Sequence, residues 1–181
     1  MPTATPATVR RQVDATAMHP VVVAHSGAGL VLPAAARALG ASRQVWLAAS
    51  LPDGRRALLE EVRAAPTEVF NPEWVGQDPT TDPVLGAYFL FHDTDLATLR
   101  WALRTVRAFI PARLYREPVT PADSIPSTYI VCTRDRTVRP DWARREAPRR
   151  VAATLLEVDA GHCPHVSQPE HLADLLSDPN S

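Results

Sequence analysis

The chain has 181 residues, of which 45% are apolar and 22% charged, and its formal net charge is −1 at pH 7. This length suits one domain with a buried core, and the near-neutral charge excludes a protein that recognises nucleic acid through a basic surface. Neither a transmembrane run nor a signal peptide is recognisable, and two cysteines are too few for a disulfide framework. We therefore expect a cytoplasmic protein in which Cys132 and Cys163 are free, buried thiols.

The first predicted strand ends in a turn that contains a serine. Residues 21–23 are three valines, which favour a strand buried on both faces, and the alanine-rich residues 33–39 favour a helix. Between them lies Ala-His-Ser-Gly-Ala at 24–28, with small residues two before and two after Ser26. A nucleophilic serine on a strand-to-helix turn needs small residues at these places, because strand and helix approach closely there. An ordinary strand–loop–helix turn remains the alternative for these five residues taken alone.

A long segment separates the second predicted strand, residues 44–49, from the rest of the sheet. Residues 52–117 are broken into short pieces by prolines, with one better helix that begins near Asp95. Eight of the eleven aromatic residues lie in this segment: Phe70, Trp74, Tyr88, Phe89, Phe91, Trp101, Phe109 and Tyr115. That is more than an irregular connection needs for its own packing. We expect a mainly helical insertion that covers a pocket or contributes to a subunit interface.

Two further strands are predicted after the insertion, over residues 127–132 and 154–158. Asp135 follows the first of them and His162 follows the second, as Ser26 follows the strand that begins at 21. The carboxyl ends of parallel strands form the edge of an open α/β sheet at which sites are built. We therefore predict four parallel strands in sequential order and a hydrogen-bonded triad of Ser26, His162 and Asp135. Asp141 is the alternative acid.

The chain order serine, acid, histidine resembles that of the α/β-hydrolase fold. Residues 129–138 and 161–164, with Pro169 and Glu170 behind them, are similar to the small cap-bearing branch that holds plant methyl-ester esterases and hydroxynitrile lyases. This resemblance implies one domain over 1–181, with a core of 9–51 and 118–181 and a cap of 52–117. It also implies catalytic roles for the three triad residues and a backbone oxyanion donor at Gly27.

The reaction that the resemblance implies is acyl transfer to water by a serine esterase that acts on a small, fairly apolar ester or lactone, without a cofactor. The candidates for substrate contact are His25, Trp74, Phe89, Phe91 and Trp101. Two alternatives stay open. One is a lyase of the hydroxynitrile-lyase type that uses the same triad, and the other is a truncated, non-catalytic remnant of the fold.

The sequence departs from the family before the serine turn. Only 25 residues precede Ser26, whereas the second oxyanion donor of the family lies on a loop after an earlier strand. We expect the first strands and that loop to be missing, and the loss of one such donor lowers the rate by roughly 10²- to 10³-fold. Residues 21–23 would then be an exposed apolar sheet edge, so a homodimer through this edge or through the cap is a further expectation.

Two short segments contain residue types that can ligate metals. His92-Asp93-Thr94-Asp95 is better explained as a helix cap, because no third ligand lies nearby in the sequence. In His162-Cys163-Pro164-His165, the proline disfavours a helical pairing of the two histidines. We therefore expect His165 to be structural and predict no metal site.

Overall fold

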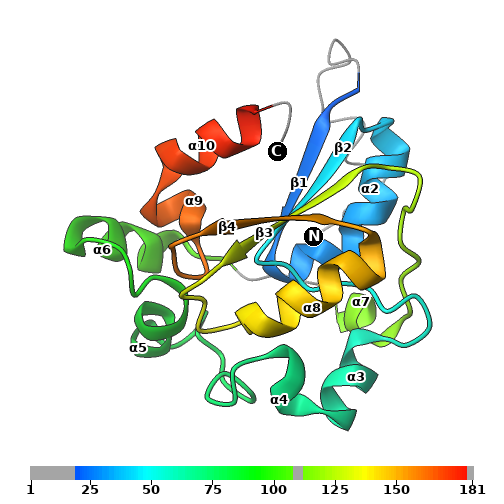
Figure 1. The fold of residues 1–181 in the computed structure, drawn as a ribbon. Helices are drawn as coiled ribbons and strands as arrows, with labels where there is room; N and C mark the ends of the chain where they lie inside the picture. The colour runs from blue at the N-terminus through cyan, green and yellow to red at the C-terminus, as the bar shows by residue number, and fades with distance from the viewer. Residues whose placement is uncertain (1–18, 108–111, 179–181) are drawn as a thin grey trace.

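Four parallel strands form the centre of the structure, a computed structural model that describes residues 19–107 and 112–178. They lie in the sheet in the order β1-β2-β3-β4 (Figure 1) and comprise β1 (Val21–His25), β2 (Arg43–Leu47), β3 (Ser127–Cys132) and β4 (Thr154–Val158). All three neighbouring pairs are parallel. The predicted four-stranded parallel sheet in sequential order is confirmed. The part of the predicted core before residue 19 lies outside the described residues.

Helices cover both faces of this sheet (Figure 1). One face packs against α2 (Leu32–Leu39) and α8 (Pro140–Val151), and the other packs against α10 (Pro169–Ser177). Leu172 of α10 lies against Val45 and Ile130 of the central strands. Because β2 and β3 are apolar on both faces, two helical layers are needed to remove them from water.

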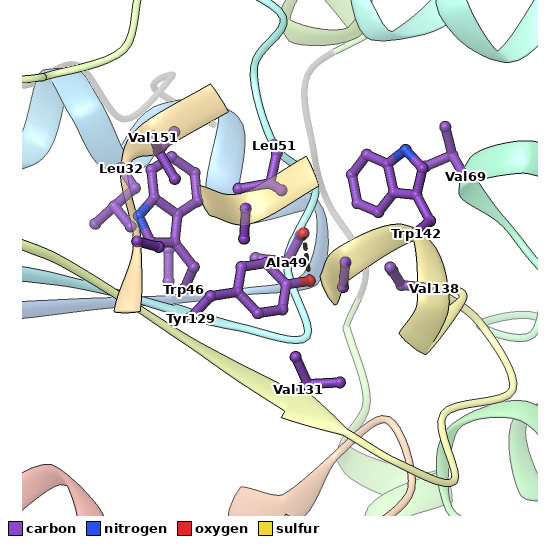
Figure 2. Packing of buried hydrophobic residues seen from close by; sticks show 14 of the residues in the cluster. Leu32, Trp46, Ala49, Leu51, Val69, Tyr129, Val131, Val138, Trp142 and Val151 are labelled. Atoms are coloured by element: carbon purple, nitrogen blue, oxygen red, sulfur yellow. Dashed lines mark hydrogen bonds between the residues drawn. The ribbon is translucent and has the colours of Figure 1, made fainter. Parts of the chain in front are cut away.

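The larger core lies between the sheet and the helices α2 and α8 (Figure 2). Trp46 of β2, Tyr129 of β3 and Trp142 of α8 are almost completely buried there. The Tyr129 hydroxyl donates a hydrogen bond of 2.8 Å to the carbonyl of Ala49, so its buried polar end is satisfied. These rings fix the spacing between β2, β3 and α8, from which the loops at the carboxyl edge extend.

The segment between β2 and β3 is mainly helical, as expected. It contains α3 (Leu58–Ala64), α4 (Pro66–Val69), α5 (Pro83–Leu85), the π-helix η2 (Gly86–Leu90), α6 (Leu96–Thr105) and α7 (Ala112–Arg116). Leu58 and Val69 join the larger core, so α3 and α4 pack with the sheet layer. Residues Phe89–Phe91 instead form a separate cluster with Ala102 of α6 and Cys163. Phe109 lies outside the described residues.

The strand β1 forms one edge of the described sheet. Val21 and Val23 are 42% and 41% exposed, which confirms the expectation of an exposed apolar sheet edge. The expectation from the run of valines, that this strand is buried on both faces, is wrong. The exposure follows from the strand order, since no described strand pairs with the free side of β1. Among the described helices, none has both the length and the apolar character required to span a bilayer.

Candidate active site

Ser26 occupies a strained turn directly after β1. Its φ is 55°, in the left-handed region that residues other than glycine rarely adopt. The 3-10 helix η1 (Ser26–Val31) begins at this residue and leads into α2. The carbonyl of Ser26 accepts a hydrogen bond of 3.0 Å from the backbone N–H of Ser50, on the segment after β2. This bond and the tight turn together fix the serine at the carboxyl edge of the sheet.

Gly29 permits the close approach that the turn requires. A Cβ atom at this position would lie 2.2 Å from the carbonyl oxygen of Ser50 and 3.1 Å from the Cβ of Ala49. Ala24 and Ala28 were the predicted small positions, and the role of Gly29 was not predicted. The second glycine of Gly27-Ala28-Gly29 is the available signal in the sequence, but its contact is with Ser50, which is 21 residues further along the chain.

The structure brings Ser26, His162 and Asp135 together in one hydrogen-bonded chain. Ser26 Oγ lies 2.9 Å from His162 Nε2, and His162 Nδ1 lies 2.8 Å from Asp135 Oδ2. A carboxylate only accepts, so Nδ1 bears the proton and Nε2 has a lone pair for the serine hydroxyl. The side chains of His162 and Asp135 are 1% and 3% exposed, which shields this chain of bonds from water.

Asp135 is held by the turn that follows β3. Its Oδ1 accepts hydrogen bonds from the backbone N–H groups of Thr137 and Val138, at 2.7 and 3.1 Å, which leaves Oδ2 free for the imidazole. Asp141, the alternative acid, is exposed and pairs with Arg144 on α8. The structure therefore places Asp135, and not Asp141, against His162.

His25 contacts the loop that holds His162. Its Nε2–H donates to the backbone carbonyl of His162 at 2.7 Å, and the two ring centroids are 4.7 Å apart. Burial lowers the pKa of His25 well below its usual value, and the neighbouring His162 and His165 add to this effect. His25 is therefore a neutral imidazole that supports the position of His162. It also lines the pocket beside Ser26.

Asp93 links the insertion to the same loop. Its Oδ2 accepts hydrogen bonds from the backbone N–H of Gly161 at 2.6 Å and from Ser167 Oγ at 2.9 Å. A Cβ on Gly161 would lie only 2.8 Å from Asp93 Oδ1, so the loop closes tightly on this carboxylate. The N-cap of α6 is Asp95, in agreement with the predicted helix cap, whereas the separate role of Asp93 was not predicted. Its local signal in the sequence is a second acid two residues before the cap.

A pocket of about 860 Å³ opens over Ser26 and His162. Its wall includes four aromatic side chains from the segment between β2 and β3: Trp74, Phe91, Trp101 and Tyr115. Phe89 is not part of this wall. It is buried behind Trp74, in an edge-to-face contact with ring centroids 5.4 Å apart. Tyr115 also lines the pocket but was not among the predicted substrate contacts. The five residues of α7 are too few for a periodicity that would predict the direction of its side chain.

Gly27 and the two thiols complete the surroundings of the triad. Gly27 is buried at the start of η1 and lines the pocket, and the leading N–H groups of a helix lack carbonyl partners within it. Cys132 and Cys163 are both free and buried, as expected, and burial raises the pKa of each thiol. Both are therefore protonated at neutral pH.

Comparisons with known proteins agree with the fold. A family model described as the alpha/beta hydrolase family matches residues 2–175. A protein of Phoma sp. described as a probable hydrolase is 34% identical in an alignment over 73 residues, and this match covers 35% of this chain and 29% of that protein. The matched stretch thus spans less than a third of this curated relative.

Solved structures show the same fold at low identity. The crystal structure of polyneuridine aldehyde esterase has a TM-score of 0.71 at 20% identity and covers 96% of this chain and 76% of its own. An Arabidopsis methylesterase has a TM-score of 0.64 at 20% identity, with coverages of 93% and 72%. A pyrethroid hydrolase from Sphingobium faniae has a TM-score of 0.66 at 17% identity, with coverages of 97% and 78%. Since the family model spans almost the whole chain, the chain belongs to the α/β-hydrolase family.

Proposed function

We propose that the chain is a serine esterase that hydrolyses a small, fairly apolar ester or lactone at Ser26. The observation that supports this most directly is the continuous hydrogen-bonded chain from Ser26 Oγ through His162 to Asp135, with separations of 2.9 and 2.8 Å. A serine hydroxyl becomes a useful nucleophile only when a neighbouring base removes its proton, and His162 Nε2 has the lone pair to do so.

In the proposed reaction, Ser26 Oγ attacks the ester carbonyl carbon while its proton passes to His162 Nε2. The tetrahedral intermediate then expels the alcohol, which takes that proton from the imidazolium and leaves an acyl group on Ser26. Water attacks the acyl carbon next, gives one proton to His162, and the acid is released as Ser26 recovers its hydrogen. Asp135 keeps its negative charge throughout and stabilises each imidazolium.

The N–H of Gly27, the residue after the nucleophile, is the proposed donor to the developing oxyanion. Loss of one such donor lowers the rate of acyl transfer roughly 10²- to 10³-fold. We therefore expect turnover to depend on this backbone N–H as well as on the triad.

The walls of the pocket favour an apolar substrate. Trp74, Phe91 and Trp101 face the same cavity as Ser26, and its volume of about 860 Å³ is large enough for a drug-sized molecule. We propose that the part of the insertion that bears these rings acts as the cap. Esterases and a methylesterase among the similar folds make an ester with a small leaving group a reasonable first substrate.

Hydrolysis of p-nitrophenyl acetate and butyrate tests the proposal. Ser26→Ala and His162→Ala should each abolish turnover, and the double variant should lose little more, because the triad acts as a unit. Ser177→Ala and His171→Gln change the same residue types on the exposed surface of α10 and serve as matched controls. Unchanged turnover in Ser26→Ala would contradict the proposal.

A further inference from the structure

We propose that His25, Cys163 and His165 form a binding site for a thiophilic divalent cation of the Zn²⁺ type, and that occupancy of this site inhibits the chemistry at Ser26. The binding part concerns these three side chains alone. The inhibitory part rests on the proposed esterase function.

The three side chains converge from two parts of the chain. His25 ends β1, while Cys163 and His165 lie at the start of α9 (Pro164–Ser167). One ligand atom from each residue lies within 4.8 Å of the others, and Cys163 Sγ is 4.0 Å from His25 Nε2. The rings of His25 and His165 have centroids 4.7 Å apart. Pro164 disfavours a helical pairing of His162 with His165. The proposed site does not use that pair, because His165 is joined by Cys163 and by His25 from β1.

The dimensions fit a small cation after a modest closure. Tetrahedral zinc has Zn–S bonds of about 2.3 Å and Zn–N bonds of about 2.0–2.1 Å, so neighbouring ligand atoms lie roughly 3.3–3.7 Å apart. Binding therefore requires the ligand atoms to approach one another by about 1 Å. His165 is exposed and Cys163 is buried, and all three residues line the pocket. The pocket therefore provides an entry path, and a fourth coordination position remains for water.

The donor types also suit a zinc-like cation. A neutral imidazole coordinates through a ring-nitrogen lone pair, and a thiol coordinates after it loses its proton. Binding thus forms two M–N bonds and one M–S bond, and the thiol proton passes to the buffer.

The same contacts link the site to the triad. The His25 nitrogen that faces Cys163 Sγ is Nε2, and this atom also donates to the backbone carbonyl of His162 at 2.7 Å. Nε2 cannot donate a hydrogen bond and coordinate a cation at once. Occupancy therefore removes the bond that supports His162, whose Nε2 must stay 2.9 Å from Ser26 Oγ. A displacement of about 1 Å at this atom is enough to lower the rate roughly 100-fold.

Cobalt titration followed by absorption spectroscopy tests binding without any substrate. The wild-type protein should bind one Co²⁺ with a thiolate-to-cobalt charge-transfer band, which Zn²⁺ should abolish by competition. Cys163→Ser should lose the band, and His165→Gln, a change at an exposed side chain, should weaken binding at least about tenfold. Cys132→Ala removes the other buried thiol and His171→Gln removes a surface imidazole, so both should bind as wild type does.

Inhibition is measured separately as the ratio of ester turnover with and without Zn²⁺ for each variant. Wild type, Cys132→Ala and His171→Gln should be inhibited, and His165→Gln should require at least about tenfold more Zn²⁺. The absence of a charge-transfer band, or equal Co²⁺ affinity in wild type and His165→Gln, would overturn the proposed site. Loss of the band in Cys132→Ala would also overturn it. Wild-type binding without ester turnover would refute the esterase function and leave the cation site intact.

Discussion

Replacement of Gly29 by alanine tests how the serine turn is held. The new Cβ would lie 2.2 Å from the carbonyl oxygen of Ser50, whereas ordinary contacts begin near 3.4 Å. The two backbone segments must therefore separate by about 1 Å, and overpacking of this kind costs about 1–3 kcal/mol. The N–H of Ser50 donates a hydrogen bond to the carbonyl of Ser26, so a displacement of Ser50 also displaces Ser26. A misplacement of about 1 Å lowers catalysis roughly 100-fold.

Urea unfolding and kcat/KM for p-nitrophenyl acetate measure the two effects of Gly29→Ala. The matched control is Gly40→Ala at the end of α2, where φ is 61° and a Cβ would meet nothing within 4 Å. This control should lose about 1–2 kcal/mol through its left-handed backbone and keep its kcat/KM. If Gly29→Ala also keeps wild-type kcat/KM, the close contact with Ser50 does not position the nucleophile and the reasoning is refuted.

Three further predictions concern single carboxylates. Asp93→Asn should lower kcat about tenfold with little change in KM, because the loop bonds from Gly161 and Ser167 lose their charged acceptor; a wild-type kcat would show that this contact does not position His162. Asp135→Asn should lower kcat by about 10⁴, since an amide favours the wrong imidazole tautomer, and steady-state kinetics that differ less than tenfold from wild type would contradict this role. Burial opposes ionisation of Glu146, but hydrogen bonds from the Arg149 and Arg150 guanidinium groups outweigh it and lower its pKa from 4.5 to about 2. Its contribution to stability is therefore present above pH 4.5 and is lost as the pH falls towards 2; urea unfolding at several pH values should show a smaller acid-induced loss in Glu146→Gln.

The sheet could be predicted from the sequence because its signals are local. Residues 21–23 form a β-branched run, and each of the triad residues follows a predicted strand within four residues. The strand order follows because consecutive parallel strands are usually neighbours joined by right-handed crossovers. The topology places Ser26, Asp135 and His162 at the same carboxyl edge of the sheet. Because β1 and β4 are the two outer strands of the described sheet, the loop after β4 must also carry His162 towards Ser26, to 2.9 Å.

The remaining features depend on contacts between distant segments. The bond from Asp93 to Gly161 and the contact of Gly29 with Ser50 leave no periodic pattern in the sequence. The cluster of His25, Cys163 and His165 also leaves no pattern in the sequence. Its members come together only because the fold places the end of β1 beside the start of α9.

The directions of the side chains within the insertion also could not be predicted from the sequence pattern. Phe89 and Phe91 are two residues apart, yet one is buried behind Trp74 while the other lines the pocket. The π-helix η2 precedes Phe91, and its wider turn departs from the helical spacing that a sequence pattern assumes.

Covalent labelling with a fluorophosphonate probe tests the central claim most directly, because it reports the nucleophile without a choice of substrate. Intact-mass and peptide analysis should find one adduct, on Ser26, which forms far more slowly in His162→Ala and is absent in Ser26→Ala. An adduct on another residue, or labelling of Ser26 at the same rate in His162→Ala as in wild type, would contradict a serine nucleophile activated by His162.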